Sequence, residues 1–153
     1  MPYISVDLQI ASESKQLPSL SDIQKWVSAA LINHRSESEI SIRIVDVTEG
    51  AKLNEQWRNK SGPTNVLSFP ADLPAEVGLP LLGDLVICAP TVEKESKQQG
   101  KPLKAHWAHI VIHGTLHLLG YDHINDDQAE FMESLETKIM MMLGYPDPYQ
   151  NNN

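Results

Sequence analysis

The sequence predicts an α+β domain in which a small mixed sheet of about four strands packs against helices. Strand-like and helix-like segments interleave along the chain, and two strand-like segments in the middle follow each other closely, as in a hairpin. One helical segment is apolar almost all round, which is typical of a buried helix. The expected strands are residues 3–10, 40–44, 65–69 and 81–88, and the expected helices are residues 21–34, 48–57, 90–100, 102–119 and 126–143.

The amino-terminal half alternates strands with helices. Residues 3–10 place four apolar side chains on one face and polar ones on the other, as a half-buried strand does. Residues 19–22 offer N-cap side chains to the first helix, whose apolar residues recur every three or four positions. Three isoleucines alternate with polar residues over 40–44, which indicates the second strand. Thr48 can cap a short helix that ends near Trp57.

The carboxyl-terminal half begins with a loop over residues 71–80, which contain two prolines and a glycine. Residues 81–88 form an almost continuous apolar strand. Pro90 suits the first turn of the next helix and Gly100 suits its end. The helix over 102–119 is the apolar one, and we expect a metal site at its end. The last helix is expected to bury Met132, Leu135, Ile139 and Met142.

Length and composition indicate one domain. The chain has 153 residues, of which 41% are hydrophobic and 21% charged, and these values fit a single domain over residues 1–150 with a disordered tail, 151–153. Its start lacks the basic and apolar regions of a secretion signal, and no apolar stretch approaches the roughly 20 residues of a membrane helix. Cys88 is the only cysteine, so we expect no internal disulfide and a cytoplasmic protein.

The charge balance restricts how the chain can bind nucleic acid. The formal net charge of −8 argues against a protein that coats nucleic acid through bulk electrostatics. A local site with one arginine and a bound divalent cation can still hold a phosphate on an acidic protein. Any nucleic-acid function therefore depends on local residues or on a docking partner.

A spaced set of histidines carries the chemistry. His113 and His117 lie four residues apart and share one face of the buried helix. Gly120 can end that helix in a left-handed conformation and turn the chain so that His123 approaches the first pair. Three imidazoles form an open metal site, for which zinc is the first choice and nickel or copper are alternatives in vitro. The spacing is that of the metzincin zinc peptidases, but Gly114 replaces their general-base glutamate.

Five other residues have alternative interpretations. Arg58 offers a planar fork that matches a phosphate, although a surface ion pair is the commoner role of such an arginine. His109 either supports a metal ligand, lines the cleft or belongs to the core. His106 faces outward or packs. Asp122 orients an imidazole, or else it caps the last helix or is solvated. Cys88 is interpreted as a small apolar residue of a buried strand.

These segments together resemble the YbeY family of bacterial rRNA maturation factors. The resemblance is ordered along the chain and is carried by His109–His123, Asn65–Pro70, Gly83–Cys88 and Leu53-Asn54 with Arg58. It implies a mixed α/β fold and a zinc-dependent, single-strand-specific endoribonuclease that acts in 16S rRNA 3′-end maturation and ribosome quality control. The implied partners are ribosomal RNA and the ribosomal subunit, with a ribosomal protein or an assembly GTPase as a docking partner.

The resemblance also assigns roles. The implied zinc ligands are His113, His117 and His123, and the implied catalytic residues are Arg58 and His113. Zinc can activate water or polarise a phosphoryl oxygen without the missing glutamate, and an arginine would stabilise charge that builds on the phosphate. Single-stranded bases can stack on side chains such as Trp57 or Tyr121. Many members carry Asp where this chain has Asn65, so a carboxylate there cannot assist.

Two other functions remain open. A zinc peptidase is favoured by the histidine spacing and opposed by Gly114. A ribosome assembly factor without catalysis would use the metal structurally, although structural zinc sites usually close with four protein ligands. The oligomeric state is also open.

Overall fold

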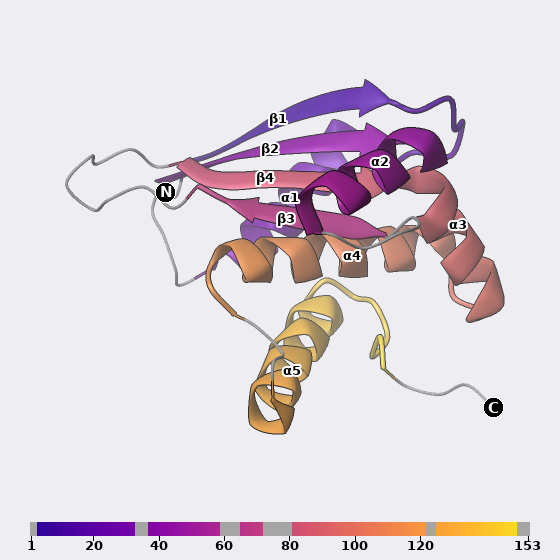
Figure 1. Cartoon of the computed structure of the whole chain (residues 1–153). Helices are drawn as coiled ribbons and strands as arrows, with labels where there is room; N and C mark the ends of the chain where they lie inside the picture. The colour runs from indigo at the N-terminus through magenta and orange to yellow at the C-terminus, as the bar shows by residue number, and fades with distance from the viewer. Residues whose placement is uncertain (1–2, 33–36, 59–64, 72–80, 122–124, 150–153) are drawn as a thin grey trace.

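The computed structural model describes residues 3–32, 37–58, 65–71, 81–121 and 125–149. A four-stranded sheet forms one layer, α4 lies along one of its faces, and α5 packs on the side of α4 that faces away from the sheet (Figure 1). The strands are β1 (Tyr3–Ala11), β2 (Glu37–Val45), β3 (Val66–Pro70) and β4 (Leu81–Cys88), and the helices are α1 (Leu20–Ala30), α2 (Val47–Arg58), α3 (Ala89–Gln98), α4 (Leu103–Leu118) and α5 (Asp126–Met142).

The sheet is mixed, as the sequence predicts. Its order is β1-β2-β4-β3, with β1 parallel to β2, β2 parallel to β4, and β3 antiparallel to β4. Ile42 in β2 pairs with Leu8 on one side and with Leu85 on the other. Parallel neighbours need a crossover, which α1 supplies between β1 and β2. The fold class is therefore confirmed as α+β with a small mixed sheet.

The core lies between the sheet and the helices α1 and α4. Ile40, Ile42 and Ile44 of β2 are at most 1% exposed, whereas Ser41 and Arg43 between them are half-buried on the other face. This alternation confirms the predicted strand pattern. The two largest buried side chains, one from α1 and one from α4, are Trp26 and Trp107.

α4 occupies the central position in this packing. It contacts β3 and β4 on one side, α1 and α3 at its flanks, and α5 on the remaining side. An all-round apolar helix needs such surroundings, because any open side would leave apolar area in water. The predicted burial of this helix is therefore confirmed, and its few polar side chains must find partners inside the protein.

Two helix details differ from expectation. α1 ends at Ala30, with Leu31 as its C-cap, and so is shorter than the expected helix. On α5, Met142 is 56% exposed, while Glu136 and Met140 are buried in its place. The predicted apolar face was wrong at that point because it counted only apolar side chains, and α5 turns a carboxylate toward α4. The expected loop over 72–80 and the tail lie outside the described residues.

Among the helices that the structure describes, none is both long enough and apolar enough to cross a bilayer.

Candidate functional site

The carboxyl-terminal end of α4 is closed by a glycine turn. Leu119 is the C-cap, and Gly120 follows with φ of +106°, a left-handed conformation that costs glycine little. The N–H of Gly120 donates to the carbonyl of His117, and the N–H of Tyr121 donates to the carbonyl of Leu116. These two bonds make a Schellman motif. The predicted helix end and chain turn at Gly120 are confirmed.

Two of the three predicted metal ligands lie side by side on α4. The rings of His113 and His117 have centroids 4.7 Å apart and are inclined at 75° to each other. The His113 side chain is 25% exposed and that of His117 is half-buried, so both reach the surface of an otherwise buried helix. His123, the third predicted ligand, and Asp122 lie outside the described residues.

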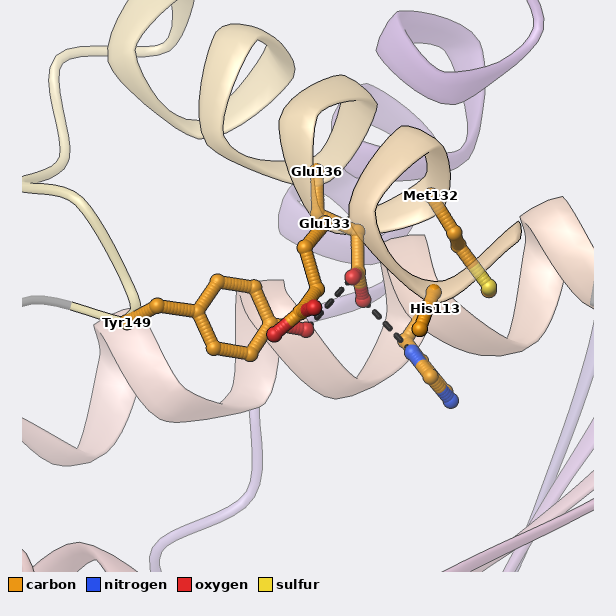
Figure 2. A pocket seen from close by; sticks show the side chains of 6 residues that line it. His113, Met132, Glu133, Glu136 and Tyr149 are labelled. Atoms are coloured by element: carbon orange, nitrogen blue, oxygen red, sulfur yellow. Dashed lines mark hydrogen bonds and ion pairs between the residues drawn. The ribbon is translucent and has the colours of Figure 1, made fainter. Parts of the chain in front are cut away.

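A buried glutamate of α5 meets this histidine face. Glu136 Oε1 lies 2.5 Å from His113 Nδ1 and 3.1 Å from His109 Nε2, and the hydroxyl of Tyr149 donates to Glu136 Oε2 at 2.5 Å. Figure 2 shows the Glu136 carboxylate between Tyr149 and His113. The Glu136 side chain has no exposed surface. Donors from two segments, α4 and the stretch after α5, therefore converge on one carboxylate.

The electrostatics follow from these contacts. Burial alone would raise the pKa of Glu136, but hydrogen bonds from His109 and His113 outweigh burial and lower the pKa to about 2. The pKa of the Tyr149 hydroxyl is raised by burial and by its bond to the Glu136 carboxylate. Glu136 is therefore ionised at neutral pH, and Tyr149 is a neutral donor to it.

A pocket of about 260 Å³ opens beside His113. The wall of this pocket comes from α4, α5 and the segment after α5, and Figure 2 shows Met132, Glu133 and Glu136 of α5 along it. Its full lining is His113, Ala129, Met132, Glu133, Glu136 and Tyr149. Two carboxylates in so small a lining disfavour an anionic ligand inside the pocket.

His109, His113 and Glu136 form a group that could hold a metal ion, because one ligand atom from each lies within 4.8 Å of the others. His109 is thus more than a core residue, since its Nε2 bonds Glu136 and its ring packs edge-on against Tyr149 with centroids 5.2 Å apart. The structure therefore offers a metal-capable histidine and carboxylate cluster on the face of α4 that carries His113.

Arg58 and Trp57 have less structural context. They are the last two residues of α2, and their side chains lie outside what the structure describes.

Cys88 is 1% exposed at the end of β4 and accepts a hydrogen bond from the Thr91 hydroxyl at 3.1 Å. This burial fits the interpretation of Cys88 as a small core residue.

His106 and Asn65 belong to a separate network. His106 is 4% exposed, and its Nε2 lies 2.9 Å from Glu95 Oε1. The Asn65 side-chain amide donates to the same carboxylate at 3.1 Å. Asn65 therefore ties the start of β3 to α3, a donor role that an aspartate could not fill beside Glu95. Burial lowers the pKa of His106, and the hydrogen bond to Glu95 opposes that effect.

Gly114 faces the sheet. A Cβ atom built there would lie 2.8 Å from Leu85 Cδ2 and 3.3 Å from Val66 Cγ2. The position at which metzincins carry their glutamate is therefore a close contact between α4 and the sheet. A long side chain has no space at this point.

Glu136 and Tyr149 are the site residues that the sequence reasoning missed. Glu136 stands among Met132, Ile139 and Met140 at helical spacing, so a charged residue interrupts an apolar face. That interruption was a signal, because a buried carboxylate needs a partner. Tyr149 carries no comparable signal, since it follows the last helix in a segment without periodicity.

Comparisons with known proteins place this chain among its relatives. The family profile described as endoribonuclease YbeY matches residues 8–144. A curated protein of Cellvibrio japonicus (strain Ueda107) named endoribonuclease YbeY is 57% identical over 150 residues, which are 97% of this chain and 85% of the relative. A Thermotoga maritima protein whose structure was determined in solution aligns with a TM-score of 0.58 at 23% identity, over 94% of this chain and 99% of that one, and shares the fold. Because the profile spans most of its length and the curated relative is similar over nearly all of it, this chain belongs to the endoribonuclease YbeY family.

Proposed function

We propose that this chain is a zinc-dependent endoribonuclease that cleaves single-stranded RNA, with His113, His117 and His123 as the zinc ligands and Arg58 as the residue that stabilises charge on the phosphate. The observation that carries the metal site is the adjacent pair of imidazoles on α4, 4.7 Å apart between ring centroids. Membership of the family supports the reaction class, because the matching profile and the curated relative are both named endoribonuclease YbeY.

The residues present fit a zinc ion. Imidazole nitrogen is a preferred zinc ligand, and His113 Nδ1 lies within hydrogen-bond distance of a carboxylate, an arrangement common among metal-binding histidines. The side chains of His113 and His117 are both half-buried and lie next to each other on α4. When bound, zinc supplies Lewis-acid chemistry, which polarises a phosphoryl oxygen and activates water.

The protein side chains determine how RNA reaches the site. The pocket beside His113 is bordered by the carboxylates of Glu133 and Glu136, which repel a phosphodiester. RNA is therefore expected to approach His113 from the His117 side. Just beyond the end of α4, the Tyr121 ring lies against Phe131, with centroids 5.9 Å apart, and Phe131 is 58% exposed. This aromatic pair offers a surface on which an unpaired base can stack.

The biological setting is proposed from the family resemblance. The chain would act on ribosomal RNA in 16S rRNA 3′-end maturation and in ribosome quality control, in the cytoplasm. It would be delivered by docking on the ribosomal subunit through a ribosomal protein or an assembly GTPase. We take residues 1–150 as one domain, because a single hydrophobic cluster includes residues from Ile23 to Met140.

The decisive test combines metal analysis with cleavage of a single-stranded RNA. Elemental analysis should find about one zinc per chain, and chelation should abolish cleavage that added zinc restores. His117→Ala should lose both zinc and activity, and Arg58→Glu should keep zinc but slow cleavage roughly 100-fold or more. Lys52→Glu reverses an exposed charge on the same helix as Arg58 and is the matched control. Equal rates in all variants would contradict the proposal.

A zinc peptidase is the alternative that the same samples can test. Gly114 packs against Leu85 and leaves no space for a glutamate base, so we expect no zinc-dependent hydrolysis of casein. Metal-dependent proteolysis by the wild-type protein, lost in His117→Ala, would favour the peptidase.

A further inference from the structure

Glu136 is a buried charge that the proposed reaction does not use. Its side chain has no exposed surface, and its neighbours on the buried face of α5 are apolar, namely Met132, Ile139 and Met140. An ionised carboxylate in such a place is costly unless donors surround it. Its presence in the contact between α4 and α5 therefore requires an explanation beyond packing.

The donors around Glu136 fix its orientation. Oε1 receives His113 Nδ1 at 2.5 Å and His109 Nε2 at 3.1 Å, and Oε2 receives the Tyr149 hydroxyl at 2.5 Å. Because both oxygens are engaged from different elements, rotation of the carboxylate would break at least one bond. Glu136 Oε1, the atom that contacts His113, is thus held in place by α4 and by the segment after α5.

The distances favour a hydrogen bond over shared coordination. Two ligands of one tetrahedral zinc ion, each about 2.0–2.1 Å from the metal, lie roughly 3.4 Å apart. Glu136 Oε1 and His113 Nδ1 are only 2.5 Å apart, which is a charge-assisted hydrogen-bond distance. An imidazole that uses Nδ1 in this way can coordinate a metal only through Nε2.

We propose that Glu136 is the positioning residue of this metal site: it fixes the tautomer and the ring orientation of His113, so that Nε2 is the nitrogen presented to the metal. His109 and Tyr149 hold the carboxylate in register. The inference rests on the proposed function for the metal itself, but the tautomer of His113 can be measured without any metal.

The first experiment measures zinc dissociation constants of metal-free protein by competition with a chromophoric chelator. Glu136→Met removes the acceptor, and Glu136→Gln keeps an amide oxygen that can still accept from His113. We expect 10–100-fold weaker zinc binding in Glu136→Met and a smaller loss in Glu136→Gln. Glu133→Gln is the matched control, because Glu133 lines the same pocket on α5 one turn earlier. We expect Glu133→Gln to bind zinc like the wild type.

The second experiment reads the tautomer. Nitrogen-15 NMR of the metal-free protein in mildly alkaline buffer should show His113 protonated at Nδ1 in the wild type and in Glu133→Gln. In Glu136→Met the proton should redistribute toward Nε2, the form that prevails in unconstrained histidine. Circular dichroism of each metal-free variant checks that it is folded, and Glu136→Gln decides the question if Glu136→Met is not.

Each result decides the proposal. Wild-type zinc affinity together with an unchanged His113 tautomer in the Glu136 variants would overturn it. Loss of zinc in Glu136→Met and His109→Ala as complete as in His117→Ala would make Glu136 a ligand, which also overturns it. If the wild-type protein takes up no zinc, the proposed metal chemistry fails, and the tautomer comparison still shows whether Glu136 orients His113.

Discussion

Gly114 shows how one small residue separates this site from a peptidase site. Gly114, the residue after His113, faces Leu85 and Val66 of the sheet. A Cβ atom at this position would already be too close to Leu85. Leu85 itself has no exposed surface, so it has little room to move aside. The missing glutamate is therefore tied to the packing of α4 against the sheet, and the proposed metal chemistry has to proceed without it.

Gly114→Glu is expected to destabilise the protein without creating peptidase activity. Overpacking against Leu85 costs about 1–3 kcal/mol, and burial of an unpaired carboxylate adds to that. Chemical denaturation should show a loss of at least about 3 kcal/mol. Lys104→Glu, an exposed substitution on the same helix, is the control and should change stability by no more than about 1 kcal/mol. Wild-type stability in Gly114→Glu would contradict the packing argument.

Phe131 provides a test of RNA binding that leaves the metal ligands intact. Phe131 is 58% exposed, and its ring lies against that of Tyr121, which is two residues past Leu119, the C-cap of α4. Loss of a stacked base costs about 1–3 kcal/mol, so Phe131→Ala should weaken single-stranded RNA binding about 5-fold or more. Met141→Ala changes an equally exposed residue of α5 and should leave the affinity unchanged. Equal affinities of the two variants would remove the stacking surface from the proposal.

α4 and α5 illustrate what the sequence can and cannot reveal. The histidine pair on α4 and the turn at Gly120 follow from local rules, namely helical spacing and the glycine C-cap, and both were predicted. The contact of Glu136 with His113 joins residues 23 positions apart, and no periodicity within either helix encodes which faces meet. Arg58 shows the same limit, because its relation to the histidines depends on how distant elements pack.

Hydrogen bonds hold the segment after α5 against the side of α4 that carries His109 and His113. Asp147 accepts from the Thr137 hydroxyl and from the Tyr149 N–H, and Lys101 donates to the Pro148 carbonyl. These bonds place the Tyr149 hydroxyl on Glu136. An irregular stretch of chain, for which the sequence offered no periodic signal, thereby reaches the candidate site.

Tyr149→Phe should weaken the attachment of this segment to Glu136 without unfolding the protein. A hydrogen bond to a charged acceptor contributes about 1.5–3 kcal/mol, and partial exposure of Tyr149 reduces this to about 1 kcal/mol. Because Glu136 would keep its two histidine donors, zinc affinity should fall only a few-fold, well short of the effect of Glu136→Met. Thermal unfolding and chelator competition measure the two effects. A zinc affinity lower than that of Glu136→Met would show that Tyr149 acts on the site directly.

The net negative charge and the buried His106 together determine how the protein responds to its surroundings. With a formal net charge of −8, the chain repels RNA at long range, so RNA binding must come from local contacts. Stability depends on groups whose pKa differs between the folded and unfolded chain. His106 is such a group, with Glu95, Lys101 and His109 around it.

The metal-free protein should become less stable as the pH falls below about 6.5. Burial lowers the pKa of His106 in the folded state, so below 6.5 the unfolded chain binds a proton that the folded chain does not. The contribution of neutral His106 to the free energy of unfolding is therefore complete above pH 6.5. It is lost as the pH falls through the lower pKa that His106 has in the folded protein. Denaturation at a series of pH values should give a shallower dependence for His106→Gln than for the wild type. Identical pH profiles would contradict this assignment.

The bond from Tyr149 to Glu136 has a practical consequence for anyone who prepares this protein. A truncation that removes Tyr149 would leave a buried acid short of one donor. A recombinant protein that keeps the chain through Tyr149 should therefore report metal uptake faithfully.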